Sequence, residues 1–296
     1  MIFKKGKVNK MIIDFHTHTF PDTMAAKVLH KLSLCSGTIP YTNGTLNDLS
    51  ASMEKACIQY SVNLSVATSA SQTASINNGI IASKETYDRL GIIPFGAIHP
   101  ENEDYKEQLK MLSNMGIKGI KIHPAYQNTD LSDIRYMKII DEASSLGMIV
   151  LTHAGIDIGL YDHNYSSVSQ ILQVIDKVHP DKFVLAHMGN WACWDDVEHD
   201  LCGAPVWFDS AFSIGPLEAN PQATPTPYSS CTMPDDQFVR ISKKHGIDKI
   251  LFATDSPWQE QKRYIERFSN IGLTKEELQL FFYENAAALL DLSSTK

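Results

Sequence analysis

Two histidines separated by one residue, His16 and His18, follow an apolar run near the start of the chain. Side chains two residues apart in a strand leave on the same face, so these two imidazoles can reach one ion together. Polar residues also end four later apolar segments, at His123, His153, His187 and Asp255. A hydrogen-bonded core histidine would explain any one of the histidines, but imidazole and carboxylate groups recurring at strand ends favour a site for Zn, Mn, Fe or Ni.

Eight short segments rich in apolar and β-branched residues recur along the chain, separated by stretches long enough for helices. They span residues 11–18, 62–69, 92–99, 117–123, 148–153, 182–187, 205–212 and 248–255. This alternation predicts parallel strands joined by helices, and eight units favour an α/β fold of the (β/α)8 TIM-barrel type. An open doubly wound sheet is the alternative, but it gives no reason for the strand ends to be so alike. In a barrel the carboxyl ends of all strands lie on one rim, so we expect the polar strand ends to converge.

The segments between the strands have apolar residues at helical spacing, and glycine follows several of them. The clearest predicted helices span residues 46–60, 105–115, 133–146, 168–178 and 234–245. No linker or charge block divides the chain, so we expect residues 1–296 to form one domain, with 1–10 as an N-terminal extension and 11–290 as the barrel. Histidines on the helices are expected at the surface or at helix ends, namely His30, His179, His199 and His245.

The composition restricts the class of partner. The 296 residues carry a formal net charge of −8, with 43% hydrophobic and 20% charged residues, which is typical of a globular protein. Nucleic acids and acidic membranes bind clustered basic surfaces, so a small-molecule substrate is expected instead. No apolar stretch suggests a signal peptide or a membrane span, and five cysteines without a CxxC pair are expected to be free thiols, so a cytoplasmic location is predicted. The oligomeric state stays open, with a homodimer as one candidate.

Six short motifs stand at the predicted strand ends and near the C-terminus. They are IDFHTH (13–18), GIKIHP (119–124), LTHAG (151–155), LAHMG (185–189), FATDSP (252–257) and ENAA (284–287). Their order resembles the amidohydrolase superfamily, and within it the amidohydrolase-2 branch that includes aminocarboxymuconate-semialdehyde decarboxylase. The resemblance covers nearly the whole chain, and it implies a metal-dependent enzyme that works with one divalent ion. Zinc is expected, with Mn, Fe or Ni as alternatives.

The resemblance also implies roles for individual residues. The implied metal ligands are His16, His18, His153 and Asp255. His187 is implied to lie beside the activated water. In some two-metal relatives a carboxylated lysine at the position of Lys121 bridges the ions, but with one ion expected we assign Lys121 to the substrate. His123 is either a substrate contact or a strand-end hydrogen bonder, and Trp258 either lines the pocket or packs against the rim.

These roles predict hydrolysis of an amide, ester or lactone by metal-activated water. An ion such as zinc lowers the pKa of bound water to about 7, while Asp255 accepts a proton and His187 orients the water or stabilises the oxyanion. The alternative is decarboxylation of a carboxylated ring or enol, which needs cations for the substrate carboxylates. Lys121 is one candidate, whereas Arg135 is expected on a helix facing solvent. A non-catalytic binding barrel is a third alternative, and the presence of all four implied ligands disfavours it.

Two loops are expected to cover the mouth of the barrel and to select the substrate. They span residues 156–167, after the fifth strand, and 215–234, after the seventh strand. Loops on the carboxyl-terminal rim carry specificity in this architecture. Glycine and tyrosine make the first loop a flexible, hydrogen-bonding segment, and four prolines stiffen the second.

Overall fold

The computed structural model describes residues 11–292, which form one eight-stranded parallel sheet curved into a barrel. The strands follow each other in chain order around it, and each pairs in parallel with the next. They are β1 (Ile13–Thr17), β2 (Tyr60–Leu64), β3 (Ile92–Ala97), β4 (Gly119–Ile122), β5 (Ile149–Thr152), β6 (Phe183–Leu185), β7 (Trp207–Asp209) and β8 (Ile250–Leu251). The predicted TIM barrel is therefore confirmed. The predicted extension at residues 1–10 lies outside the described residues.

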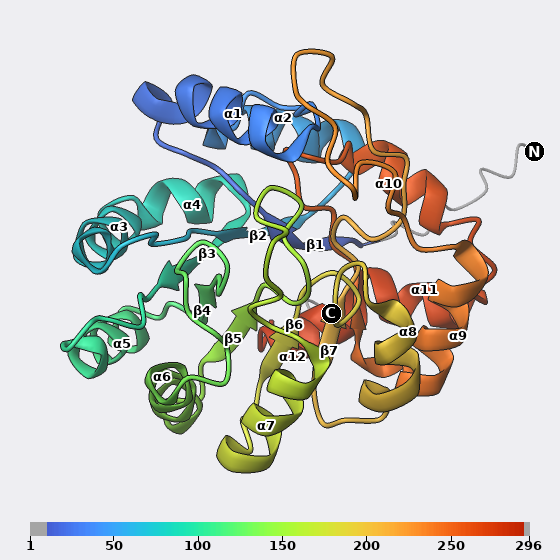
Figure 1. The fold of residues 1–296 in the computed structure, drawn as a ribbon. Coiled ribbons are helices and arrows are strands. Elements are labelled where there is room, and N and C mark those ends of the chain that lie inside the picture. The colour runs from blue at the N-terminus through green and yellow to red at the C-terminus, as the bar shows by residue number, and fades with distance from the viewer. Residues whose placement is uncertain (1–10, 293–296) are drawn as a thin grey trace, which may run out of the picture.

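Helices surround the barrel and alternate with its strands (Figure 1). The α-helices are α1 (Asp22–Ser36), α2 (Leu46–Ala56), α3 (Ala70–Ala82), α4 (Lys84–Leu90), α5 (Tyr105–Asn114), α6 (Ile134–Ser145), α7 (Val168–Val178), α8 (Trp194–Asp196), α9 (Asp235–His245), α10 (Gln261–Phe268), α11 (Lys275–Gln279) and α12 (Asn285–Leu289). Three shorter helical segments, two of π type and one of 3-10 type, are η1 (Val197–Leu201), η3 (Leu280–Glu284) and η2 (Ile247–Lys249). In the described part of the chain, no helix is both long and apolar enough to cross a membrane.

The barrel is closed by contacts between β1 and the segment that follows β8. The amide of Phe15 donates to the carbonyl of Phe252 at 2.9 Å, and the amide of Asp255 donates to the carbonyl of His16 at 2.8 Å. Beside them the buried carboxylate of Asp14 accepts hydrogen bonds from the amide and hydroxyl of Thr254, at 3.0 and 2.6 Å. Burial raises the pKa of Asp14 to about 6, although these donors favour its ionised form. This closure fixes the HxH pair against Asp255.

Apolar side chains divide between two clusters on the two faces of the strands. The inner cluster fills the barrel with alternate strand residues such as Ile149 and Leu151, and α12 packs against it. The larger outer cluster holds the other face, including Ile120 and Ile122, against the helices. Because Lys121 lies between these two isoleucines and pairs in register with Leu151, its side chain belongs to the interior of the barrel.

An irregularity in β1 aims the HxH pair at the same interior. Ile13 and Phe15 belong to the inner cluster, and simple alternation would send His16 to the opposite face. The register with β2 shifts between Asp14 and Thr17, which is the effect of a β-bulge. After the shift, His16 and His18 both face the carboxyl-terminal opening.

The boundaries of several predicted elements were wrong. The second strand begins at Tyr60 instead of residue 62 and ends at Leu64, because the helix predicted for 46–60 ends at Ala56, where Cys57 takes a left-handed φ of 57°. The strands predicted for 182–187, 205–212 and 248–255 are shorter, because polar residues after them leave the ladder. His187 and Asp255 have φ values of 61° and 65°, which a strand does not contain. The helix predicted for 168–178 is confirmed as α7.

His245 lies at a helix end, one of the two positions expected for it, but it is buried. It ends α9, its Nε2 lies 2.9 Å from the carbonyl oxygen of Val206, and its Nδ1 accepts from the amide of Gly203 at 3.1 Å. Its ring stacks on that of Phe208, with the two ring centres 3.8 Å apart. Burial lowers the pKa of His245 from 6.5 to about 4.

This histidine makes the fold sensitive to acid. Above the unfolded-state pKa of about 6.5 both states are neutral, and as the pH falls towards 4 only the unfolded state gains a proton, so stability is lost in that window. Between pH 7 and pH 5, we expect the unfolding free energy of His245→Gln to fall by about 2 kcal/mol less than that of the wild-type protein. Urea denaturation at both pH values measures this, with the exposed His199→Gln as control. An equal loss in His245→Gln and wild type would contradict the assignment.

Candidate metal centre and substrate cavity

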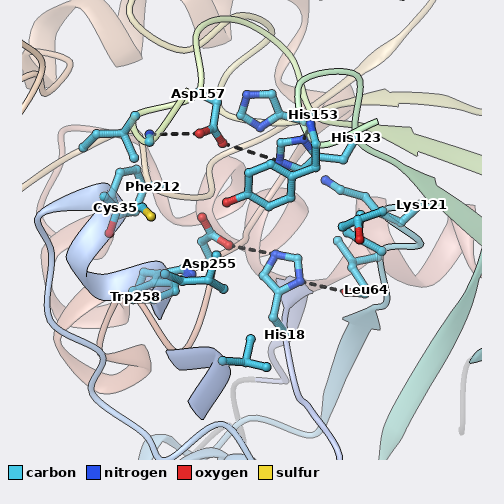
Figure 2. A pocket seen from close by; sticks show the side chains of 18 of the residues that line it. His18, Cys35, Leu64, Lys121, His123, His153, Asp157, Phe212, Asp255 and Trp258 are labelled. Atoms are coloured by element: carbon cyan, nitrogen blue, oxygen red, sulfur yellow. Dashed lines mark hydrogen bonds and ion pairs between the residues drawn. The ribbon is translucent and has the colours of Figure 1, made fainter. Parts of the chain in front are cut away.

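A cavity of about 590 Å³ opens at the carboxyl ends of the strands. Its floor carries the polar strand ends that the sequence singled out. They are His16, His18, Lys121, His123, His153, His187 and Asp255. The structure therefore places every predicted site residue in one cavity, and Trp258 lines it as well. Figure 2 shows the side chains of His18, Lys121, His123, His153 and Asp255 converging from different parts of the chain.

Three of the four predicted ligands form a tight group. Nε2 of His16 lies 3.1 Å from Nε2 of His18, and Oδ1 of Asp255 lies 3.5 and 3.1 Å from these two nitrogens. One ligand atom from each residue lies within 4.8 Å of the others. The fourth predicted ligand, His153, lies outside this group. It belongs to a second group, with His123 and Asp157.

Hydrogen bonds behind the first group determine which nitrogens carry protons. Nδ1 of His16 lies 2.8 Å from the carboxylate of Asp209, and Nδ1 of His18 lies 2.7 Å from the carbonyl oxygen of Leu64. Both oxygens only accept, so both Nδ1 atoms donate and both neutral Nε2 atoms present lone pairs. Oδ1 of Asp255, which faces them, is a buried oxygen without a hydrogen-bond partner in residues 11–292. Three acceptors facing one another are unfavourable without a cation, so this donor set fits a divalent ion.

Burial favours the protonation states that metal binding requires. It lowers the pKa of His16 well below 6.5, and the nearby Lys121 charge lowers it further. Burial alone would raise the pKa of Asp255, but the neighbouring His16 and His18 outweigh it, and the pKa falls below its usual value. A neutral imidazole beside an ionised carboxylate is the state in which both residues bind metals.

His187 and His153 form a second pair beside this group. Nδ1 of His187 lies 2.8 Å from the carbonyl oxygen of Ala211, so it donates there, and Nε2 accepts. That Nε2 lies 3.1 Å from Nδ1 of His153, which must then supply the shared proton. Nε2 of His153 is left as a buried acceptor with no hydrogen-bond partner in the described chain. Nε2 of His153 therefore also has a lone pair available for a metal ion.

The second group is less suited to an ion. His123 stacks between Tyr126 and His153, with ring centres 3.9 and 4.2 Å away and nearly parallel planes. Its Nδ1 accepts from the amide of Tyr126 at 3.3 Å, so the neutral ring carries its proton on Nε2, which faces Asp157 at 3.6 Å. A protonated nitrogen and two stacked rings do not direct lone pairs at one point.

Lys121 is a buried cation at the cavity floor. Its side chain is 1% exposed, and no residue of 11–292 lies within hydrogen-bond or ion-pair distance of its ammonium. Burial lowers its pKa to about 8, although Asp209 and Asp255 favour the charged form. Figure 2 shows its nitrogen directed towards the space beside His123 and His153.

The walls of the cavity differ from the expected pair of loops. Residues 156–160 line it, as predicted for the first loop, but no residue of 215–234 does. That second loop packs behind α1, where the amide of Ile39 donates to the carbonyl of Glu218 and the amide of Asn220 donates to the carbonyl of Gly37. The missing wall is supplied by α1, through residues such as Val28 and Leu32. The prediction that loop 215–234 covers the mouth directly was therefore wrong, and this loop buttresses the helix that does.

Sequence reasoning missed two acidic residues of the site. Asp209 is fully buried and, besides His16, accepts hydrogen bonds from the amides of His187 and Ala211 at 2.9 and 3.0 Å. It ends β7, but the strand predicted there ran on to residue 212, so the criterion that selected the histidines passed over it. Asp157 lies in the loop after β5, where burial raises its pKa to about 6. No strand end marks it, because the backbone turn at Gly159 brings it back over the floor.

Comparisons with known proteins agree with this geometry. A family model described as amidohydrolase matches residues 13–292. An uncharacterized TIM-barrel protein from Bordetella bronchiseptica superimposes with a TM-score of 0.74 at 18% identity, covering 95% of this chain and 98% of that one. A dihydroxybenzoic acid decarboxylase from Polaromonas with bound manganese gives 0.69 at 12% identity, covering 96% and 97%. A putative 2-pyrone-4,6-dicarboxylic acid hydrolase from Pseudomonas putida gives 0.63 at 14% identity, covering 95% and 98%. No curated protein matches the sequence.

The contact between Asp209 and His16 predicts an indirect effect on metal affinity. Asp209→Asn removes the negative charge that holds the proton on Nδ1 of His16, so we expect metal affinity to fall about 10- to 100-fold. Competition with a fluorescent chelator measures it. Ser210→Ala is the matched control, because Ser210 is the next residue but bonds to Ala253 instead of a candidate ligand. Equal affinities in Asp209→Asn and Ser210→Ala would contradict this role.

Proposed function

Because this chain belongs to the amidohydrolase family, we propose that it is a metal-dependent hydrolase of a small molecule, acting on an amide, ester or lactone. The observation that carries the proposal is the convergence of two imidazole nitrogens on a buried carboxylate oxygen that accepts no hydrogen bond within residues 11–292. His16, His18 and Asp255 are proposed to hold one divalent ion, with His153 as the fourth ligand. Zinc, a single domain, a cytoplasmic location and a homodimer remain predictions from the sequence.

A divalent ion bound there would polarise a substrate carbonyl and activate water at neutral pH. Asp255, ionised in its surroundings, is proposed to accept the proton that the water releases. His187, whose ring is fixed by the carbonyl of Ala211 and by His153, is proposed to orient the water or to stabilise the oxyanion. Lys121 and His123 are proposed to bind the substrate, and Trp258 to line its pocket.

Decarboxylation remains the second candidate. The decarboxylase from Polaromonas shows that this fold accommodates that reaction. A carboxylated substrate would need cations, and Lys121 is the only buried one among the lining residues. Arg135 is exposed and pairs with Asp133 at 2.8 Å, so it does not contribute to the cavity. This scarcity of cations favours hydrolysis.

Replacing Asp255 tests the catalytic assignment. Asp255→Asn keeps the shape of the side chain but removes both a metal ligand and a base, so we expect turnover to fall ~100-fold or more while the fold is kept. A screen of lactones, amides and carboxylated aromatics first identifies the substrate for the assay, and circular dichroism checks the fold. Asp176→Asn, on the exposed face of α7, is the control. Turnover of Asp255→Asn equal to that of the control would show that the ion is not catalytic.

The number of ions is a separate prediction. Of the two candidate groups in residues 11–292, that of His16, His18 and Asp255 directs lone pairs at one point, so we expect one ion per chain and an unmodified Lys121. Elemental analysis of the purified protein measures the stoichiometry, and peptide mass measurement shows whether Lys121 carries an added carboxyl group. Two ions per chain, or a carboxylated Lys121, would replace this prediction with the two-metal arrangement.

A further inference from the structure

We propose that the substrate of this site has a single anionic group on an apolar body, with the anion at Lys121 and the body between α1 and the loop after β5. The inference rests on the proposed function, since it concerns the substrate of the same cavity. It assigns a substrate class and the wall residues that select it.

The position of the anion follows from the isolation of the Lys121 ammonium. A fully buried cation without a hydrogen-bond partner is costly, and in proteins such groups are paired or satisfied by a ligand. Asp209 and Asp255 influence it through space, but neither reaches ion-pair distance, and both are engaged with histidines. The cavity is the open space that adjoins Lys121, so an anion entering it is the partner that this cation lacks.

The apolar body follows from the walls above that floor. On one side, α1 presents Val28 and Leu32. On the other side, the loop after β5 presents Ile156, Ile158 and Leu160. Removing apolar surface of this kind from water is favourable, so an apolar group of a ligand is stabilised between these walls. The two walls therefore select an apolar group next to the anionic one.

A second anion on the substrate would have no buried cationic partner among residues 11–292. The other cation of the lining is Lys31, an exposed residue on the outer part of α1. No arginine lines the cavity, whereas the buried carboxylate of Asp157 does, in the loop that forms the apolar wall. A second carboxylate at that wall would be desolvated beside a like charge, which is unfavourable. The cavity thus discriminates against dicarboxylates.

The test compares three carboxylates, each with one group more than the one before, and one uncharged amide. Acetate has the anion alone, 3-phenylpropionate adds an apolar body, and 3-(4-carboxyphenyl)propionate adds a second anion at the far end. Calorimetric titration of the metal-loaded protein at pH 7, below the pKa of Lys121, measures each affinity. We expect 3-phenylpropionate to bind ~10- to 100-fold more tightly than acetate. We expect the dianion to bind more weakly than 3-phenylpropionate, and uncharged 3-phenylpropionamide to bind more weakly too.

Two variants assign these effects to the proposed residues. Leu32→Ser should weaken binding of 3-phenylpropionate severalfold and leave acetate unchanged. Leu34→Ser is its matched control, because Leu34 lies on the same helix, is exposed and does not line the cavity. Lys121→Met should weaken the binding of both monoanions. If this variant does not fold, the comparison of 3-phenylpropionate with its amide on the wild-type protein shows whether the site prefers an anion.

Three results would overturn the proposal. They are equal or tighter binding of the dianion, equal behaviour of Leu32→Ser and Leu34→Ser, and equal binding of 3-phenylpropionate and its amide. The proposed hydrolase function fails on different results, namely no retained metal or turnover that survives its removal. Because ligand selectivity and metal content are measured on the same preparation, failure of one is distinguishable from failure of the other.

Discussion

The central constraint on this structure is that three hydrogen-bond acceptors converge on the floor of the cavity. Nε2 of His16, Nε2 of His18 and Oδ1 of Asp255 approach to between 3.1 and 3.5 Å, and none of them carries a proton in the tautomers that their neighbours impose. The rest of the rim serves this arrangement. Asp209 and the carbonyl of Leu64 hold the protons on the far sides of the two rings. The β1 irregularity aims both rings inward, and the β1–β8 contacts bring Asp255 against them.

Much of this was predictable because it depends on local patterns repeated along the chain. Strand and helix alternation gives the barrel, and barrel topology alone brings polar strand ends together, whatever their distance in sequence. The same logic fails where the backbone leaves regular structure. His187 and Asp255 reach their positions through left-handed φ values, so they follow strands that are shorter than the sequence suggests. The bulge in β1 has no signature in residues 13–17, because it results from pairing with β2.

The cavity walls were harder to predict for a different reason. The helix α1 follows the HxH strand immediately and carries Val28 and Leu32, but amphipathic spacing cannot say that an apolar face covers a cavity instead of the core. Loop 215–234 was assigned by its position after β7, whereas its backbone bonds to residues 37–39 hold it behind α1. The place of a residue after a strand was therefore enough to predict the residues of the cavity floor. It was not enough to predict the residues of the walls.

The floor and the walls also carry different parts of the chemistry. Every ionisable group of the floor lies on a strand or among the first residues after one, and hydrogen bonds orient His16, His18 and His187 there. The walls come from a helix and a loop separated by about half the chain, and their side chains contribute shape and apolar surface. Reactivity and selectivity can then change independently, since a residue of α1 can be replaced without moving His16 or Asp255. Lys121 is the exception, because its strand places it on the floor while its charge is proposed to act on the substrate. It is therefore the residue at which substrate choice and the electrostatics of the metal centre are coupled.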